Sequence, residues 1–241
     1  MMTMTSHSEA EMNHRTLVID IETVGSSDPA VVEQIAAGIK APATYKKPES
    51  IAEWEATQKP LAVDEAVSKT SFDGAWGHIV CIGWKVGHEP ARSLEVSNID
   101  DEADMLVQFW SEMRGLFKQG DNILSRPRII GHNVNSFDLR YLKQRSIVLG
   151  CVWPSWFPFD SKPWESDRVF DTMTEFAGVG NRISLDKLAK VLGHEGKGEV
   201  SGADVWPMFK AGRIEEIAKY CREDVEMTHA VYKSMMSVME R

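Results

Sequence analysis

Four carboxylates from three separate segments are the residues of this chain best suited to chemistry. They are Asp20, Glu22, Asp138 and Asp224. Each lies within or beside an apolar run, where an ionised group is rarely buried unless it is paired or binds a metal. If the four met at one point, they would repel one another strongly unless divalent cations neutralised them. The set therefore indicates a two-metal site for cleaving phosphodiesters.

The spacing of the first pair supports this interpretation. Residues 16–21 are apolar and β-branched, as expected of a buried strand. Because side chains alternate along a strand, Asp20 and Glu22 should point to the same face, about 6–7 Å apart, where they can share one metal. An Asp-x-Glu pair alone is a weak signal, since a solvated acidic strand end has the same sequence.

The third segment adds a second kind of side chain. Tyr220 and Asp224 are four residues apart in a predicted helix, so both should project from one face, about 6 Å apart along the axis. The aspartate can hold a metal there, while the tyrosine hydroxyl contacts a water one turn away. Taken alone, a tyrosine at this spacing is more often a core residue.

The elements that must position these side chains alternate in a recognisable order. Strands are predicted at residues 16–21, 78–86, 93–96, 128–131 and 168–171, and helices at 104–118, 136–149, 185–192 and 214–239. Asp100 or Asp101 should cap the first of these helices and Ser184 the third. Three strands in succession, followed by helix–strand alternation, predict an α/β fold with a mixed sheet and helices packed on its faces.

A long insertion follows the first strand. Ser27 or Asp28 before Pro29 is a typical helix start, and Ser50 with Glu53 has the pattern of a capping box. We therefore expect two short helices. The insertion is either a structural ornament or a guide near the active edge, and the sequence leaves both open.

Composition fits one soluble domain. The chain has 241 residues, 43% hydrophobic and 26% charged, enough for one substantial α/β domain, although two small ones are not excluded. We expect residues 1–15 to be disordered and 16–241 to form a single domain, with the insertion at about 25–75. The net charge of −9 does not suggest a general nucleic-acid binder. An enzyme that acts on strand ends, however, needs only a local basic patch.

The cysteines indicate the compartment. Cys81, Cys151 and Cys221 are odd in number and lack paired spacing, so neither a disulfide framework nor a zinc knuckle is indicated. The sequence has no apolar run suited to a signal peptide or a membrane span. A cytoplasmic location and no membrane partner are expected.

The three acidic segments resemble the exonuclease motifs of the DEDD superfamily of 3′–5′ exonucleases, in the tyrosine-bearing (DEDDy) form. The matching residues are Asp20-x-Glu22, Asn133-x₃-Phe137-Asp138 and Tyr220-x₃-Asp224. Residues 131–142 are particularly similar to the proofreading domain of family B DNA polymerases. Residues 76–84 and 220–225 resemble stand-alone prokaryotic and phage exonucleases related to that domain. The resemblance covers about residues 16–233, and no polymerase portion is present.

The resemblance implies a fold, a cofactor and a reaction. The fold would be ribonuclease H-like, and the cofactor would be two Mg²⁺ or Mn²⁺ ions. Asp20 would bridge both ions, Glu22 and Asp224 would complete the ion nearest the nucleophile, and Asp138 would hold the other mainly through water. Tyr220 would orient the attacking water, because a phenol with a pKa near 10 is a poor base at neutral pH. Nucleoside 5′-monophosphates would leave from a 3′ end.

The resemblance also indicates residues that contact the substrate. Thr23 and Asn133 match positions beside the terminal nucleotide. Phe137 would pack beneath the site or stack on a base. Basic residues near the second and third motifs are candidates for a phosphate track, although scattered surface charge would have the same pattern. These residues are Arg140, Lys143, Arg145, Arg182, Lys187, Lys190 and Lys197.

Several further residues allow two interpretations. Asp171 ends a predicted strand and would either support the site or cap a helix. His132 and His229 are interpreted as structural, because the tyrosine already supplies the water-orienting group. The tryptophans of residues 153–164 would either stack on single-stranded nucleic acid or anchor their loop.

The predicted substrate is single-stranded nucleic acid, with DNA favoured over RNA, and no obligate protein partner is indicated. An exoribonuclease on the same fold is the first alternative, because contacts to a 2′-hydroxyl cannot be identified from sequence. An inactive nucleic-acid-binding module is the second. A lost ligand would mark such a module, whereas here all four carboxylates and the tyrosine are present.

Overall fold

A five-stranded mixed sheet forms the centre of the molecule. The computed structural model describes residues 16–119, 122–123, 126–162, 164–196, 198 and 200–239. The strands are β1 (Thr16–Val24), β2 (His78–Val86), β3 (Arg92–Glu95), β6 (Arg128–Gly131) and β7 (Val169–Asp171), in the order β3-β2-β1-β6-β7. β2 is antiparallel to both of its neighbours, whereas β1, β6 and β7 run parallel. The predicted mixed sheet is confirmed.

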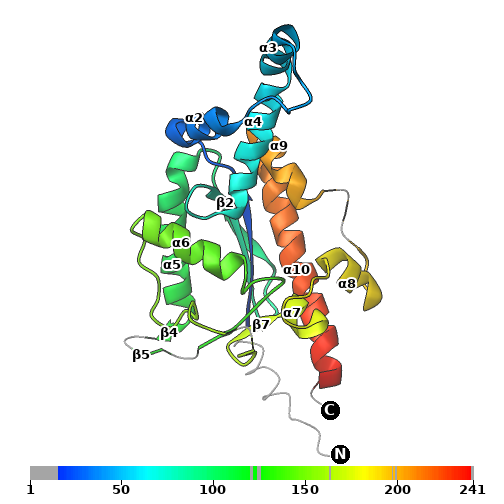
Figure 1. Cartoon of the computed structure of the whole chain (residues 1–241). Helices are drawn as coiled ribbons and strands as arrows, with labels where there is room; N and C mark the ends of the chain where they lie inside the picture. The colour runs from blue at the N-terminus through cyan, green and yellow to red at the C-terminus, as the bar shows by residue number, and fades with distance from the viewer. Residues whose placement is uncertain are drawn as a thin grey trace, which may run out of the picture.

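Helices cover both faces of this sheet (Figure 1). One face carries α5 (Glu102–Leu116) and α6 (Asp138–Val148), and the other carries α8 (Leu185–Val191) and α10 (Ile214–Met239). Short elements complete the fold: η2 (Ile99–Asp101), β4 (Lys118–Gln119), β5 (Asn122–Ile123), α7 (Thr172–Ala177), η3 (Gly202–Asp204) and α9 (Val205–Lys210). Among the helices of the described residues, none is long and apolar enough to cross a membrane.

The alternation of β1 determines where its carboxylates point. Leu17, Ile19 and Ile21 belong to the larger core cluster, together with apolar residues of α5 and α6. Val18 belongs to a second cluster with residues of α8 and α10. Because side chains two apart share a face, Asp20 and Glu22 lie on the same face as Val18, which is covered by α10.

The insertion contains three α-helices, so the prediction of two was wrong. They are α2 (Pro29–Gly38), α3 (Pro48–Thr57) and α4 (Lys59–Ser68), followed by the 3₁₀ turn η1 (Lys69–Phe72). Asp28 caps α2 as expected, accepting from the Ala30 amide at 2.8 Å. Ser50 is not a cap, because α3 already begins at Pro48 and the Ser50 hydroxyl donates to the Lys47 carbonyl oxygen.

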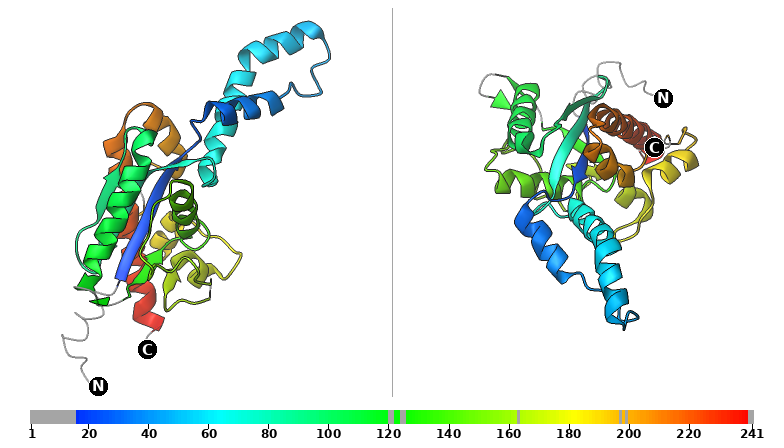
Figure 2. Two further views of the ribbon diagram at one scale, coloured as in Figure 1. Left: turned by 90° about the vertical axis from the view of Figure 1, so that its left-hand side faces the viewer. Right: turned by 90° about the horizontal axis from the view of Figure 1, so that it is seen from above.

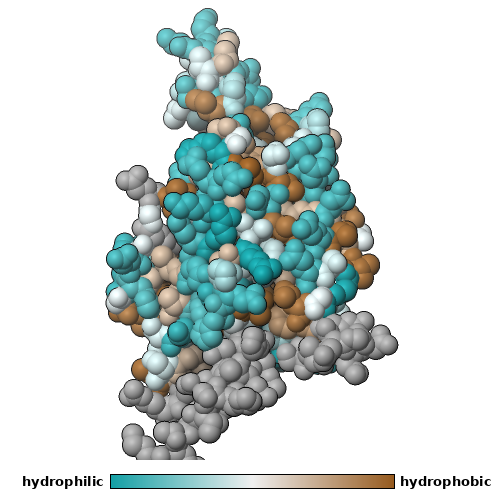
Figure 3. Space-filling view, turned by 180° about the vertical axis from the view of Figure 1, so that it is seen from behind, coloured by the Kyte–Doolittle hydropathy of each residue, from teal (hydrophilic) through white to brown (hydrophobic). Residues whose placement is uncertain are grey.

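Figure 2 shows that α3 and part of α4 project from the body as an arm. Seen from behind, the arm and the body below it carry mainly hydrophilic side chains, with small hydrophobic patches between them (Figure 3). The arm therefore extends beyond the two layers of helices that cover the sheet.

Other predicted boundaries were close, and their differences have local causes. β2, β6 and α10 have the predicted ends, and Ser184 caps α8 by accepting from the Lys187 amide. α5 begins earlier than expected, after η2, and Asp101 makes no side-chain capping bond; Asn98 instead caps η2. α6 begins at Asp138 because the residues before it form a turn. The elements α7, α9, β4 and β5 were not predicted.

Candidate active site

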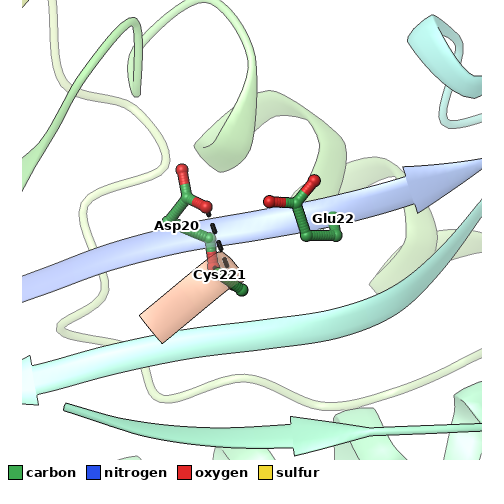
Figure 4. A group of neighbouring side chains, drawn as sticks. All are labelled: Asp20, Glu22 and Cys221. Atoms are coloured by element: carbon green, nitrogen blue, oxygen red, sulfur yellow. Dashed lines mark hydrogen bonds between the residues drawn. The ribbon is translucent and has the colours of Figure 1, made fainter. Parts of the chain in front are cut away.

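Asp20 and Glu22 lie side by side on β1 and point in the same direction, as predicted (Figure 4). Their carboxylate oxygens and the Cys221 sulfur lie within 4.8 Å of one another. The β1–β2 register shifts between Glu22 and Thr23, where the partners change from Cys81 to Ile79. Such irregularities re-aim side chains beside a site. Glu22 is buried, whereas Asp20 is partly exposed.

Asp138 reaches β1 from the start of α6. The parallel β6 pairs with β1 over Thr16–Val18. Further along β1, the Ile21 amide donates to Asp138 Oδ1 at 3.1 Å. The second motif is therefore bonded directly to the strand that carries the first. Burial raises the pKa of Asp138 well above its ordinary value, and the nearby charge of Asp20 raises it further.

The third motif reaches the same point through a close contact between α10 and β2. Gly83 pairs with Asp20 across the β1–β2 ladder, and a Cβ atom on Gly83 would lie 2.8 Å from Cys221 Sγ and 3.1 Å from Val225 Cγ2. Glycine therefore allows α10 to approach the sheet beside the first motif.

Buried carboxylates near Tyr220 affect the pKa of its phenol. Burial raises the pKa of the Tyr220 phenol far above its ordinary value, and the carboxylates of Asp224, Glu22 and Asp20 raise it further. Tyr220 and Asp224 are both buried. The residues predicted from three distant segments are thus brought together, and the phenol remains protonated beside three carboxylates.

Cys221 was not singled out by sequence, although it lies within the third motif. Its thiol lies 3.6 Å from both the backbone oxygen and Oδ2 of Asp20. Burial raises the pKa of Cys221 well above its ordinary value, and a hydrogen bond with Cys81 adds to this effect. Without a bound cation the thiol is therefore protonated, and hard divalent cations prefer oxygen to sulfur donors. The donors available to a hard cation are the carboxylate oxygens, which suit Mg²⁺ and Mn²⁺.

Asp171 holds the loop of the second motif. Its carboxylate accepts from the amides of Asn133 at 2.9 Å and Asn135 at 3.1 Å. It also caps α7, accepting from the Met173 amide at 3.1 Å. Asn133 has a positive φ of 62°, a conformation tolerated by asparagine. Asp171 therefore fulfils both interpretations, as a helix cap and as a support for the loop that leads into Asp138.

His132 makes a structural link. Its Nδ1 lies 2.9 Å from Thr172 Oγ1, and its Nε2 lies 2.9 Å from the Ile183 carbonyl oxygen. Both ring nitrogens thus contact protein groups. Burial lowers the pKa of His229 to about 4, and its ring packs at 6.2 Å from that of His88. These contacts agree with the structural roles expected for both histidines.

One basic residue of the predicted phosphate track is buried and cannot contact a substrate. Arg145 is buried and pairs with Glu102 through Nε at 2.8 Å and Nη2 at 2.7 Å. Its inclusion was wrong, because the guanidinium ties α6 to α5 and is not available to a substrate. Lys190 bonds to Asp186 at 2.8 Å. Lys197 lies outside the described residues.

The predicted substrate contacts differ in their surroundings. The Thr23 hydroxyl donates to the Ser71 carbonyl oxygen of η1 at 2.8 Å, so Thr23 joins β1 to the insertion. Phe137 is partly buried and packs against both Phe72 and Tyr141. Its ring thus packs against aromatic neighbours and remains partly exposed.

The tryptophan loop mainly anchors itself. Trp156 is buried against Phe117, with ring centroids 5.2 Å apart. Trp153 packs on Phe159 at 5.3 Å, whereas Trp164 is exposed. For two of the three tryptophans, the anchoring interpretation accounts for the contacts.

Comparison with known proteins agrees with this geometry. A family B DNA polymerase from the hyperthermophilic archaeon Pyrobaculum calidifontis has a similar structure, with a TM-score of 0.57 and 16% sequence identity. The match covers 92% of this chain and 24% of the polymerase chain, so this chain spans about a quarter of its length. The similarity supports the predicted ribonuclease H-like fold. No curated protein matches the sequence.

A family model gives the more direct assignment. The model, described as a predicted 3′–5′ exonuclease related to the exonuclease domain of PolB, matches residues 78–241. The matched region contains Asp138, Tyr220 and Asp224, whereas Asp20 and Glu22 precede it and are placed beside the other three by the sheet. This chain belongs to the family of predicted 3′–5′ exonucleases related to the exonuclease domain of PolB.

Proposed function

We propose that this chain is a metal-dependent exonuclease that hydrolyses single-stranded DNA from its 3′ end and releases nucleoside 5′-monophosphates. The observation that carries the proposal is the meeting of three motifs at one point. Asp138 bonds to the backbone of β1 beside Asp20, and α10 places Tyr220 within the field of Glu22 and Asp20. The family to which the chain belongs supports the same reaction.

The four carboxylates fit a pair of hard divalent cations. The charge of Asp20 raises the pKa of both Asp138 and Tyr220, and a bound cation would offset that charge. By resemblance to the DEDD exonucleases, Asp20, Glu22 and Asp224 would hold one ion, and Asp20 and Asp138 would hold the other. Such cations, when bound, lower the pKa of a water and stabilise the leaving oxygen of a phosphodiester.

The role proposed for Tyr220 depends on the protonation of its hydroxyl. Burial and the neighbouring carboxylates raise the pKa of the phenol, so its hydroxyl would form a hydrogen bond with the water rather than take its proton. A fixed hydroxyl at this position would orient the attacking water relative to the scissile phosphate. Its position one turn before Asp224 on α10 suits this role.

The test is parallel digestion of 5′-labelled single strands of DNA and RNA with the same sequence, in Mg²⁺ and in Mn²⁺. We expect a ladder that shortens from the 3′ end, with DNA consumed faster. Asp224→Asn should reduce cleavage to near background. Glu223→Gln is the matched control, since the neighbouring Glu223 side chain is 58% exposed and pairs with Lys219 at 3.6 Å.

Each alternative predicts a different outcome of this experiment. Faster products from RNA would replace the DNA preference with an exoribonuclease. Binding of single strands without shortening, in either metal, would identify an inactive binding module. Equal loss of activity in Asp224→Asn and Glu223→Gln would contradict the assignment of Asp224 as a ligand.

A further inference from the structure

One buried carboxylate next to the second motif accepts four backbone hydrogen bonds. Asp171 ends β7 and is 1% exposed. Its Oδ1 accepts from the amides of Met173 at 3.1 Å and Thr174 at 3.3 Å, both in α7. The same oxygen accepts from the Asn133 amide at 2.9 Å, and Oδ2 accepts from the Asn135 amide at 3.1 Å. Asp171 therefore joins two separate segments, α7 and the loop before α6.

The cap of α7 accounts for only half of these bonds. A capping side chain satisfies the first amides of its own helix, and aspartate, asparagine and serine do so about equally well. Asp28 and Ser184 cap α2 and α8 in this way, each accepting from an amide of its own helix. Asp171 differs because it also accepts from amides 36 and 38 residues away in the sequence. Its bonds to the loop thus call for a second explanation.

The loop held by Asp171 leads directly into Asp138. The Asn133 carbonyl oxygen accepts from the Phe137 amide at 3.0 Å, one residue before Asp138. Asp138 in turn accepts from the Ile21 amide of β1. Only two hydrogen bonds therefore connect the Asp171 carboxylate to the residue next to Asp138. A shift of the loop would move the predicted metal ligand with it.

The loop depends on such support because its backbone is strained. Asn133 has a φ of 62°, and a residue other than glycine keeps such a conformation only where its surroundings impose it. On one side, a Cβ on Gly131 would collide with the Val134 side chain, so the loop packs closely on the end of β6. On the other side, the loop is held by Asp171.

We propose that Asp171 is a positioning residue for the reaction, and that its carboxylate holds residues 133–135 so that Asp138 keeps its place beside Asp20. This inference rests on the proposed function and deepens it, because it names a group that acts on the site through another residue. Aspartate suits this role because its two oxygens can accept from several donors at once. A side chain with one oxygen cannot serve both segments in the same way.

Asp171→Ser separates the loop from the cap. Serine caps a helix about as well as aspartate, but it has a single oxygen on a shorter side chain, so it can bond to α7 and not also to the loop. Hydrogen–deuterium exchange of the metal-free protein should become faster across residues 132–138 and stay unchanged across residues 172–177. A role limited to capping predicts wild-type exchange in both segments.

The same variant should slow cleavage and weaken the metal site. Single-turnover cleavage of a short single strand, well below the melting temperature, should fall roughly 10²-fold, the cost of a misplacement of about 1 Å. The rate should fall more than the affinity for the strand, and calorimetric titration should show weaker Mn²⁺ binding. Asp171→Asn keeps one oxygen and turns an amide group toward the Asn135 amide, so it should change exchange, rate and Mn²⁺ affinity in the same direction. It decides the inference if Asp171→Ser does not fold.

Glu102→Gln is the matched control, because Glu102 is also a carboxylate that is 1% exposed and it bonds to Arg145 and the Ile79 amide. It should lower the melting temperature and leave the cleavage rate unchanged. An equal loss of rate in this control would overturn the positioning role.

The remaining outcomes separate this inference from the proposed function. Wild-type exchange across residues 132–138, or a wild-type rate and Mn²⁺ affinity in folded Asp171→Ser, would overturn the positioning role, while cleavage by the unmodified enzyme still upheld the proposed function. If the unmodified chain shortened no strand, the proposed function would fall. The exchange pattern and the Mn²⁺ titration would then decide the inference, and wild-type behaviour in either one would overturn it.

Discussion

Gly83→Ala tests whether the close approach of α10 to β2 sets the geometry of the site. The added Cβ would lie 2.8 Å from Cys221 Sγ, 3.1 Å from Val225 Cγ2 and 3.3 Å from the Cys221 carbonyl oxygen. Ordinary contact begins near 3.4 Å, so α10 must move away by roughly 0.6 Å or the sulfur must rotate. Overpacking of this kind costs about 1–3 kcal/mol.

The same displacement should reduce catalysis, because Tyr220 and Asp224 move with α10 while Asp20 stays on β1. A misplacement of about 1 Å can cost 10²-fold in rate, so we expect a loss of roughly ten- to a hundredfold for the smaller shift. Thermal melting should register the packing cost at roughly 2–4 °C per kcal/mol. Single-turnover cleavage of a short single strand would measure the rate.

Two comparisons separate this effect from a general cost of adding a methyl group. Gly115→Ala, within α5 and with nothing within 4 Å of the new Cβ, should be stabilising by about 0.5–1 kcal/mol. Adding Cys221→Ala to Gly83→Ala removes the shortest contact and should recover part of both losses. Wild-type melting temperature and wild-type rate in Gly83→Ala would refute the reasoning.

Three other perturbations probe the phenol, the carboxylates and the buried ion pair. Tyr220→Phe keeps the ring and removes the hydroxyl, so single-turnover cleavage should fall on the order of 10²-fold while calorimetric Mn²⁺ affinity stays the same; a wild-type rate would make Tyr220 a core residue. Mn²⁺ at about 100 times its Kd should stabilise the fold by about 2.7 kcal/mol and raise Tm by roughly 5–10 °C. Asp20→Ala should reduce this rise, and an unchanged Tm of the wild type would count against a preformed metal site. Burial favours a raised pKa for Glu102, but hydrogen bonds with His78 and Arg145 outweigh burial and hold the pKa below the ordinary glutamate value. The Glu102 carboxylate therefore stabilises the fold at pH values above the ordinary glutamate pKa, and this stabilisation is lost as the pH falls through the lowered pKa of the folded state. Glu102→Gln should destabilise by about 3–5 kcal/mol at neutral pH, because the buried Arg145 loses its carboxylate partner. It should also flatten the acid limb of a Tm-versus-pH curve, and an acid limb identical to that of the wild type would contradict this.

Sequence reasoning succeeded where a short segment determines its own geometry. The alternation along β1 places Asp20 and Glu22 on one face, and the helical spacing of Tyr220 and Asp224 places them on one side of α10. It failed where the partner is distant. Arg145 is a basic side chain in sequence, and only its proximity to Glu102, forty-three residues earlier, removes it from the surface.

Competing local signals caused the other errors. Ser50 and Glu53 match a capping box, but Pro48 can start a helix on its own, and α3 begins there. The contact of Cys221 with Asp20 depends on Gly83 of β2, which has no side chain and so was not considered as a site residue. A glycine within a strand is the available signal for such close approaches.

The pairing of β1 with β2 on either side of the insertion affects how readily the insertion can change in length. Val24 and His78 pair directly across β1 and β2, so the chain leaves and re-enters the sheet at neighbouring positions. The entropy of closing such a loop grows only slowly with its length. Segments of other lengths can therefore be accommodated at this junction at little entropic cost, provided that they replace the contact by which the Ser71 carbonyl oxygen accepts from Thr23 beside Glu22.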